Sequence, residues 1–381
     1  MKGDNVSLQF NTFLDAATKN EVIRLTPLTN TCHRNYFYQK CFTSDGKSLL
    51  FAGDFESNLN YYLLNIFTQE AMQLTEKEGD NTFGGFLSHD DKYLYYVKNN
   101  SSLQRVDLKT LQEDTIYKSP ADWVAYGTWV ANSDTAKIVG IEIHKDSWIP
   151  LDSWEAFAKM YHSQPLCRLF RVDLTTGQRE IIHEDKTWLG HPIYKPFDDN
   201  TVAFCHEGPH DLVRSRIWFI NENGTNMRQG KVQAADEHCT HEFWIPDGSK
   251  MIYVSFKDNT QERGIYSVDS NTLENKLIMS MPNCSHLMSN FHGTLFVGDG
   301  TAPPQDVINK NNHNFANDAN LYVFNANSQE TRVAGLHKSS WKVLNGNRQI
   351  THPHPSFTPN EQGILWSSDM EGNVAIYLTK I

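Results

Sequence analysis

The chain has 381 residues, of which 39% are hydrophobic and 12% aromatic, and its formal net charge is −11. No run approaches the roughly 18 apolar residues that a membrane-spanning helix needs, so we expect no membrane partner. The 45 acidic residues outnumber the 34 basic ones and no Lys/Arg run stands out, which argues against nucleic acid, whose phosphates favour a basic surface.

The beginning of the chain, residues 1–7, lacks the apolar stretch and small-residue cleavage site of a secretory signal. A cytoplasmic location is therefore the default expectation. A strand is predicted over residues 21–26.

The cysteines form neither a C-x-x-C pair nor a dense framework, so we expect reduced structural thiols at Cys32, Cys41, Cys167, Cys205, Cys239 and Cys284.

From residue 43 onward the chain repeats a unit of strands separated by turns that mostly contain Asp or Asn. The turns recur at Asp45, Asp90, Asp134, Asp199, Asp247, His292 and Asn360. The shorter steps between them, 44 to 48 residues, match a four-stranded propeller blade. The repeat predicts an all-β, seven-bladed β-propeller that forms a single domain over residues 1–381. A two-domain β protein is the alternative.

The third strand of each unit is an apolar segment, at 61–64, 103–106, 169–172, 217–220, 265–268, 321–324 and 375–378. A fourth strand follows six of them, whereas the seventh unit ends at Ile381 without one. The N-terminal strand has the same pattern, so we expect it to complete the last blade and to remove an exposed sheet edge.

The two longer steps carry insertions, which in repeat proteins map to loops and often to the binding face. The first insertion, at 145–164, contains a predicted short helix over 154–161. The second comprises an Asn-rich stretch at 309–320 and the segment 337–349.

Histidines recur at one position of four successive units, five residues before the turn, at His191, His241, His286 and His354. This position is expected to open the first strand of each blade, which lines the central channel, so the side chains would converge on the axis. One histidine alone is readily explained as a hydrogen-bonded channel residue. A matched set of imidazoles favours a transition-metal site, although the ligand type does not select the metal.

The last unit adds a second histidine, because His352 and His354 are two residues apart. On a strand this spacing places both side chains on one face. Pro353 and Pro355 would disrupt a central strand but are tolerated on an edge strand, and the channel strand is the inner edge of its sheet. Both histidines are therefore predicted to reach one ion.

An H-E-x-x-H sequence at 206–210 has a different interpretation. This zinc motif works on a helix, and Gly208-Pro209 in its centre breaks one. We interpret it as coincidental loop sequence. The chain also contains no G-x-S-x-G, P-loop or G-x-G-x-x-G motif, so serine hydrolase and nucleotide chemistry lose their usual support.

Six segments together resemble the oligogalacturonate lyase family, along essentially the whole chain. They are HRNYFYQK (33–40), DNTFGGF (80–86), CHEGPHDLV (205–213), THEFW (240–244), CSHLMS (284–289) and QITHPHP (349–355). The resemblance implies a cytoplasmic seven-bladed enzyme of pectin degradation that converts digalacturonate and unsaturated digalacturonate to keto-deoxyuronate by metal-assisted β-elimination. It implies Mn²⁺ as the metal, with another divalent transition metal as the alternative.

The metal ligands that the resemblance implies are His286, Gln349, His352 and His354. Gln349 rests on the resemblance alone, whereas the register or strand spacing also selected the histidines. Imidazole and amide donors bring no charge, so an acidic protein could use the full charge of the ion to bind an acidic sugar.

The resemblance also implies that His241 is the catalytic base and that Arg216 assists as an acid or as a substrate anchor. Arg34, His191 and Arg216 are candidate contacts to a substrate carboxylate or hydroxyl, because Arg pairs bidentately with carboxylates. Ordinary structural ion pairs are the alternative for these three. The expected partner is a short oligogalacturonate, and nothing indicates the oligomeric state.

Two other functions remain open. One is a metal-free binding propeller of the TolB type, and the other is a metal-dependent hydrolase or isomerase on the same scaffold.

Overall fold

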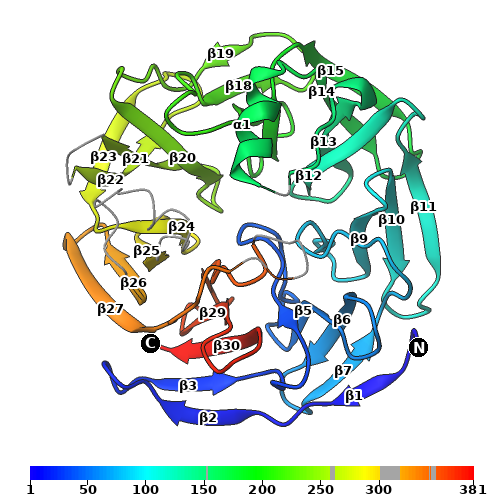
Figure 1. The fold of residues 1–381 in the computed structure, drawn as a ribbon, viewed down its shortest axis with the longest axis vertical. Helices are drawn as coiled ribbons and strands as arrows, with labels where there is room; N and C mark the ends of the chain where they lie inside the picture. Colours follow the sequence, from blue (N-terminus) through cyan, green and yellow to red (C-terminus); the bar gives the residue numbers. More distant parts are fainter. Residues whose placement is uncertain (152, 258–261, 301–317, 343, 345–348) are drawn as a thin grey trace. The chain divides into compact units, whose positions relative to one another are not determined.

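The computed structural model describes residues 1–381 except 152, 258–261, 301–317, 343 and 345–348. The chain divides into two compact units, unit 1 with residues 1–87 and 281–381, and unit 2 with residues 88–280. Each unit is built from antiparallel sheets (Figure 1). The prediction that 1–381 is one domain, and the central channel that goes with it, stay predictions.

The described part of unit 2 holds four sheets, each made of consecutive strands. In sheet order, their strands are β11 (Glu113–Lys118), β10 (Ser102–Asp107) and β9 (Tyr93–Lys98); β12 (Trp123–Ala131), β13 (Lys137–His144), β14 (Cys167–Asp173) and β15 (Arg179–Asp185); β16 (Leu189–Tyr194), β17 (Thr201–His206), β18 (Ile217–Asn221) and β19 (Arg228–Gln229); and β20 (Glu237–Trp244), β21 (Met251–Lys257), β22 (Arg263–Val268) and β23 (Asn275–Ser280).

The described part of unit 1 holds three sheets, and its strand β8 (Phe86–Leu87) ends the first segment. In sheet order, the strands are β1 (Asn5–Ser7), β7 (Glu70–Gln73), β6 (Asn60–Asn65), β5 (Ser48–Gly53) and β4 (Cys32–His33); β2 (Asn11–Leu14), β3 (Glu21–Arg24), β30 (Ala375–Lys380), β29 (Gly363–Ser368) and β28 (Ser356–Phe357); and β24 (Cys284–Ser289), β25 (Leu295–Gly300), β26 (Asn320–Asn325) and β27 (Glu330–Leu336).

The seven sheets confirm the seven predicted repeats, and each predicted third strand lies within β6, β10, β14, β18, β22, β26 or β30. The second strands are buried on both faces, as the nearly unbroken burial of β5 and β13 shows. Such strands read as continuous apolar runs in the sequence. The turns between strands use left-handed residues such as Gly46, with φ 69°, and Gly248, with φ 76°.

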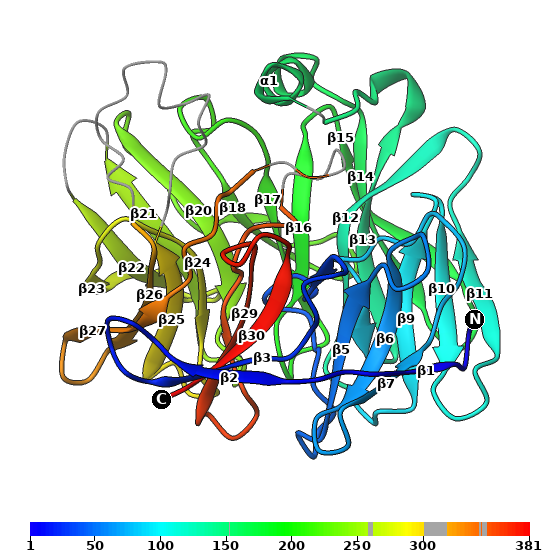
Figure 2. The same cartoon turned by 60° about the horizontal axis from the view of Figure 1, so that its bottom comes forward.

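The N-terminal segment confirms one prediction and adds two strands that the sequence did not indicate. As predicted, β3 pairs antiparallel with β30, with Ile23 opposite Leu378. In addition, β2 pairs with the outer side of β3, and β1 pairs with β7 of the neighbouring sheet (Figure 2). Two of the three sheets of unit 1 therefore have a fifth strand that covers the edge of the fourth.

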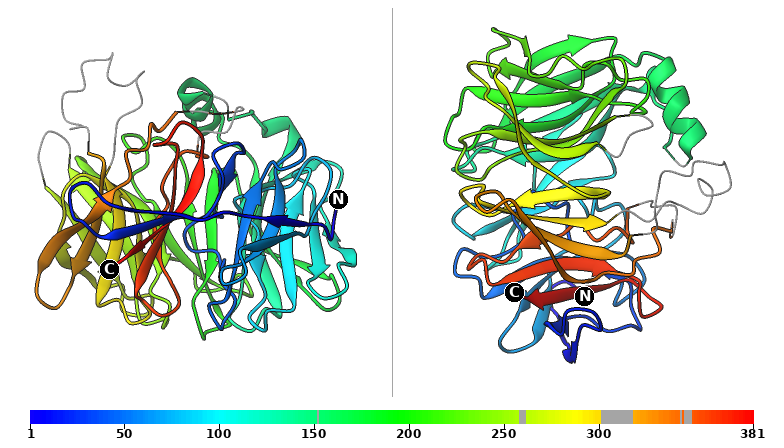
Figure 3. Two further views of the ribbon diagram at one scale, coloured as in Figure 1. Left: turned by 90° about the horizontal axis from the view of Figure 1, so that it is seen from below. Right: turned by 90° about the vertical axis from the view of Figure 1, so that its left-hand side faces the viewer.

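The first insertion contains the predicted helix, α1 (Trp154–His162), which lies on one side of the unit 2 sheets (Figure 3). Ser153 caps it, since its hydroxyl accepts a hydrogen bond from the backbone N–H of Ala156 at 3.0 Å. Met160 is fully buried, and Phe157 packs against Trp188 with ring centroids 4.8 Å apart. No described helix is long and apolar enough to cross a membrane. The Asn-rich part of the second insertion lies mostly outside the described residues.

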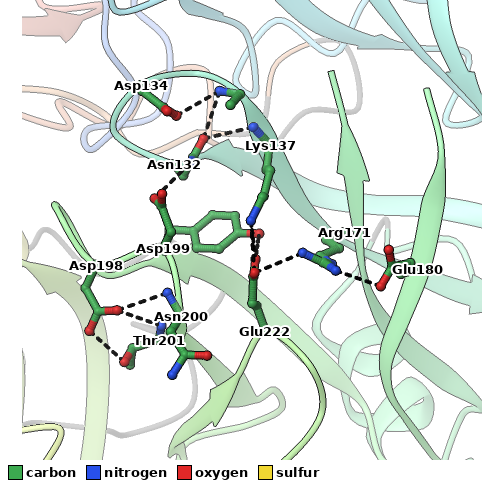
Figure 4. A network of polar contacts seen from close by, with 12 residues as sticks. Asn132, Asp134, Lys137, Arg171, Glu180, Asp198, Asp199, Asn200, Thr201 and Glu222 are labelled. Carbon is green, nitrogen blue, oxygen red and sulfur yellow. Dashed lines mark hydrogen bonds and ion pairs between the residues drawn. The ribbon is translucent and has the colours of Figure 1, made fainter. Parts of the chain in front are cut away.

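A polar network joins the second and third sheets of unit 2 (Figure 4). Glu222, just after β18, accepts hydrogen bonds from Lys137 Nζ at 2.9 and 3.1 Å and pairs with Arg171 at 3.0 Å. Arg171 also binds Glu180 at 2.7 Å, and Asn132 donates to Asp199 at 2.9 Å. The network fixes how these two sheets pack against each other.

All six cysteines are buried free thiols, as predicted. Burial raises the pKa of Cys167 and of Cys239 to about 12, in each case with a nearby carboxylate adding to the effect. The thiolate form is therefore strongly disfavoured at both positions.

Candidate functional site

Three histidines of unit 1 form a compact cluster. Nitrogen atoms of His286, His352 and His354 all lie within 4.8 Å of one another. The ring centroids of His286 and His354 are 4.1 Å apart, and that of His352 lies 5.3 Å and 5.6 Å from them. The prediction that these three side chains converge is confirmed.

His286 reaches the cluster from a β-bulge. In the pairing of β24 with β25, Cys284 lies opposite Gly300 and Leu287 opposite Gly298, so Ser285 and His286 together face one residue, Asp299. A bulge of this kind redirects a side chain and is frequent beside active sites.

The prediction that His352 and His354 lie on a strand is wrong. Both precede β28, in a segment whose residues 352–355 belong to no strand. Pro353 and Pro355 have no N–H to donate to a ladder, which explains why the strand begins only at Ser356. His354 instead adopts a left-handed backbone, with φ 46°. The loop conformation, rather than the alternation of a strand, thus brings the two imidazoles close to His286.

The cluster fits a divalent transition metal. Nδ1 of His352 is buried and has no hydrogen-bond partner among the described residues. Burial, and then the charge of His286, hold the pKa of His352 well below its ordinary value, which keeps this imidazole neutral as a metal ligand must be. Trp341 stacks on both His286 and His352, at 5.6 and 4.2 Å between ring centroids. These rings restrict how the ligands can turn.

Gln349 and Arg34 also lie in unit 1. Gln349 is exposed, and its backbone carbonyl accepts a hydrogen bond from the N–H of His352 at 3.0 Å. Arg34 is only 1% exposed and donates to Ser356 Oγ at 2.6 Å and to the carbonyl of Leu365 at 3.2 Å. Their predicted roles as a metal ligand and as a substrate contact stay predictions.

His191 and His241 lie in unit 2, each in a β-bulge of the first strand of its sheet. The ladder of β16 with β17 shifts between Gly190 and Ile193, and that of β20 with β21 shifts between Thr240 and Phe243. Both histidines are left-handed, with φ 46° and 55°. This backbone is unusual for residues other than glycine and is concentrated at functional sites.

Arg216 lies at the centre of a buried ion-pair network in unit 2. Its guanidinium binds Glu242 through Nε at 2.8 Å and NH2 at 3.1 Å, and binds Glu207 through NH1 at 3.0 Å. The other oxygen of Glu207 lies 3.1 Å from Nε2 of His191. Arg216 therefore connects the bulge that contains His241 and Glu242 with the His191 side chain.

The network changes the pKa values of its members. Burial opposes ionisation of Glu207, but Arg216 and His191 outweigh it and hold the pKa of Glu207 well below its ordinary value. Burial likewise disfavours the charged form of His191, but Glu207 raises its pKa above the ordinary value. The charged form of His191, whose side chain is 26% exposed, is thus favoured by its contact with Glu207.

Sequence reasoning missed Asp299, Glu207 and Glu242 as parts of these clusters. Glu207 is part of the H-E-x-x-H sequence at 206–210. As predicted, this sequence is not helical, because His206 ends β17 and Gly208 has φ 145°. Glu242 directly follows His241. No short motif identified Asp299, because its partners are distant in the sequence.

Comparisons with known proteins agree along the whole chain. A family model described as oligogalacturonate lyase matches residues 1–381. An oligogalacturonide lyase of Pectobacterium atrosepticum is 58% identical over 380 residues, and an oligogalacturonate lyase of Dickeya dadantii is 57% identical; each alignment covers 100% of this chain and 98% of the relative.

The fold agrees as well. A solved oligogalacturonate lyase in complex with manganese is 56% identical and superimposes with a TM-score of 0.95, covering 100% of this chain and 98% of that one. The all-β, seven-bladed β-propeller fold class is confirmed. With identities above 50% over its full length, the chain belongs to the oligogalacturonate lyase family and is an oligosaccharide lyase.

Proposed function

We propose that this enzyme binds Mn²⁺ and cleaves digalacturonate and unsaturated digalacturonate by β-elimination, releasing keto-deoxyuronate. The observation that carries the proposal is the convergence of three imidazoles within 4.8 Å, in a chain 56% identical to a lyase solved with manganese. Another divalent transition metal would meet the same ligands.

His286, His352 and His354 hold the metal in this proposal, and the amide oxygen of Gln349 is the fourth ligand. Gln349 precedes His352 by three residues in the same loop, and its carbonyl already fixes the backbone of His352. When bound, the ion acts as a Lewis acid on the substrate carboxylate and stabilises the charge that develops when the adjacent C5 loses its proton.

His241 removes the C5 proton. A neutral imidazole is the side chain best suited to accept a proton near neutral pH. The half-buried His241 stands on a bulge with a left-handed backbone, and its neighbour Glu242 is clamped by Arg216. These contacts support a base held in a defined orientation.

Positive charge on the protein assists binding of the acidic sugar. The side chain of His191 is partly exposed and its charged form is favoured by Glu207, so it pairs with a substrate carboxylate or hydroxyl. Arg34 is buried and pairs with no carboxylate among the described residues, so it contributes through its uncompensated charge. Arg216 already binds two carboxylates, which supports a positioning role more than the predicted role of acid or direct anchor. The proposed place of action is the cytoplasm, as the family resemblance implies.

Incubation of the purified enzyme with digalacturonate, with and without a chelator, tests the proposal. We expect turnover that stops when the metal is removed and returns when Mn²⁺ is added. The products should absorb as unsaturated or keto uronates, and their summed mass should equal that of the substrate, because elimination adds no water.

The rival functions give different results. A hydrolase adds one water to the summed mass, an isomerase leaves a product of unchanged length, and a metal-free binding propeller consumes no substrate. Any of these outcomes would replace the proposal.

A further inference from the structure

Asp299 is a fully buried carboxylate behind the histidine cluster of unit 1. It lies on β25, at the single position that faces the two bulged residues of β24. The strands approach closely beside it, because a Cβ added to Gly298 would lie 2.3 Å from the sulfur of Cys284. The backbone therefore holds Asp299 firmly against His286.

Three hydrogen bonds converge on this carboxylate. Oδ1 accepts from the backbone N–H of His286 at 2.7 Å, and Oδ2 lies 2.9 Å from Nδ1 of the same residue. Oδ2 also accepts from the backbone N–H of His354 at 3.3 Å. One side chain thus holds two of the three clustered histidines, although they are 68 residues apart in the sequence.

The chemistry of these contacts fixes the imidazole. An ionised carboxylate only accepts hydrogen bonds, so Nδ1 of His286 carries the proton and donates it. The lone pair of Nε2 is then the one available to a metal ion. The carboxylate also makes the imidazole a better electron donor.

The comparable bulges of unit 2 lack this arrangement. The residues that face the bulges of β16 and β20 are Phe204 and Tyr253. There His191 and His241 take left-handed backbones, whereas His286 does not. A carboxylate opposite the bulge is therefore not a requirement of bulge geometry, and it occurs where the histidines cluster.

We propose that Asp299 is a positioning residue for the metal: it sets the tautomer of His286, orients His286 and His354 together, and places a carboxylate behind the imidazole ligands. This inference rests on the proposed metal site. It changes the expectation that the substrate meets the full charge of the ion. Asp299 offsets part of that charge and at the same time strengthens the binding of the ion to the histidines.

Titration of the metal-free full-length enzyme with Mn²⁺ by calorimetry tests the inference without measuring activity. Asp299→Asn keeps the shape, but its amide NH₂ must face one of the three N–H donors. We expect roughly 10- to 100-fold weaker Mn²⁺ binding, the usual effect of removing a carboxylate behind a metal-bound histidine.

Asp15→Asn is the matched control. Asp15 is also buried in unit 1 and accepts three backbone N–H groups, from Ala17 at 3.0 Å, Thr18 at 2.8 Å and Leu336 at 2.9 Å. None of these partners is a histidine. We expect this variant to lose a similar amount of stability and to bind Mn²⁺ as the wild type does.

Folded Asp299→Asn protein with wild-type Mn²⁺ affinity would overturn the inference and leave the metal site intact. Wild-type protein that binds no Mn²⁺ would instead overturn the proposed function. Should Asp299→Asn not fold, ¹⁵N-histidine NMR of the metal-free wild type decides: we expect His286 protonated at Nδ1, and protonation at Nε2 would overturn the inference.

Discussion

Two polar clusters, one in each unit, bring potential metal ligands within 4.8 Å of one another. In unit 1 they are His286, His352 and His354, and in unit 2 they are His191, Cys205 and Glu242. The distances between donor atoms do not distinguish the two clusters, but the charged groups around them differ.

The carboxylates of the unit 2 cluster already have cationic partners. Arg216 binds the carboxylates of Glu207 and Glu242, and Glu207 favours the charged form of His191 beside it. Burial raises the pKa of Cys205 well above its ordinary value, so its thiol stays uncharged. In the unit 1 cluster the carboxylate of Asp299 lies against His286, and burial keeps the pKa of His352 well below its ordinary value, so that the His352 imidazole is neutral. A buried carboxylate is stabilised by a nearby cation, and a metal ion bound by the imidazoles would supply one. Charge balance, more than donor spacing, shows which cluster suits a metal.

The largest effect is expected at His241, the unit 2 residue that we propose as the catalytic base. His241→Ala should reduce turnover by roughly 100- to 10,000-fold, the usual contribution of a general base. Mn²⁺ content, measured by metal analysis of the purified variant, should stay normal because no unit 1 ligand changes. Retained activity would reject the assignment of His241.

Removing one side chain from each cluster and measuring Mn²⁺ affinity tests which of the two clusters binds the metal. His352→Ala should weaken Mn²⁺ binding by more than the roughly 100-fold that loss of a carboxylate behind a ligand can cause. Calorimetric titration measures it, with Cys205→Ala of the unit 2 cluster as the control that binds normally. A loss of Mn²⁺ binding in the control would break the comparison, since it would place metal in the unit 2 cluster.

Arg216→Met should destabilise the protein by about 3–5 kcal/mol, because it leaves the buried carboxylates of Glu207 and Glu242 without their cation. Urea denaturation followed by fluorescence measures the change. Arg105→Met is the control, since the Arg105–Asp114 pair is more exposed and its loss should cost under about 1 kcal/mol. Equal losses in both variants would show that burial does not set the strength of the Arg216 network.

The smallest effect is a pKa change within the unit 2 cluster. Glu207→Gln should lower the pKa of His191, because burial then acts on it without the opposing carboxylate. NMR titration of the His191 ring measures this directly, and an unchanged pKa would show that Glu207 is not its partner.

The His191–Glu207 pair also predicts how the stability of the fold depends on pH. The raised pKa of His191 stabilises the wild type below pH about 6.5, the value of a free imidazole, and this contribution is lost as the pH rises through the raised value. The lowered pKa of Glu207 stabilises it above pH about 4.3, and this part is lost as the pH falls further. Glu207→Gln should flatten both slopes.

The repeat and the convergence of the histidines were predictable because both depend on local periodicity. Apolar third strands recur in every unit and turns with Asp or Asn in most of them, and a fixed offset from the turn located His286 and His354. The backbone that presents them was not predictable. Spacing of two residues indicated a strand at His352, but two prolines prevented the ladder, and the bulges at His191 and His241 leave no mark in an apolar pattern.

The charged partners were also beyond the sequence. Asp299, Glu207 and Glu242 act through contacts made only when strands pair or when a side chain crosses to another strand. An isolated acidic residue inside an apolar run is the signal that could have marked Asp299, between Val297-Gly298 and Gly300.

The pairing of β3 with β30 joins residues 22–24 to residues 377–379. A ribosome releases the first of these strands long before it makes its partner, so this pairing cannot form until residues 377–379 have been made. Loss of the last few residues would leave β3 unpaired together with the β2 strand it carries. A chain without residues 377–379 would therefore expose an unpaired strand edge on β3, which favours aggregation.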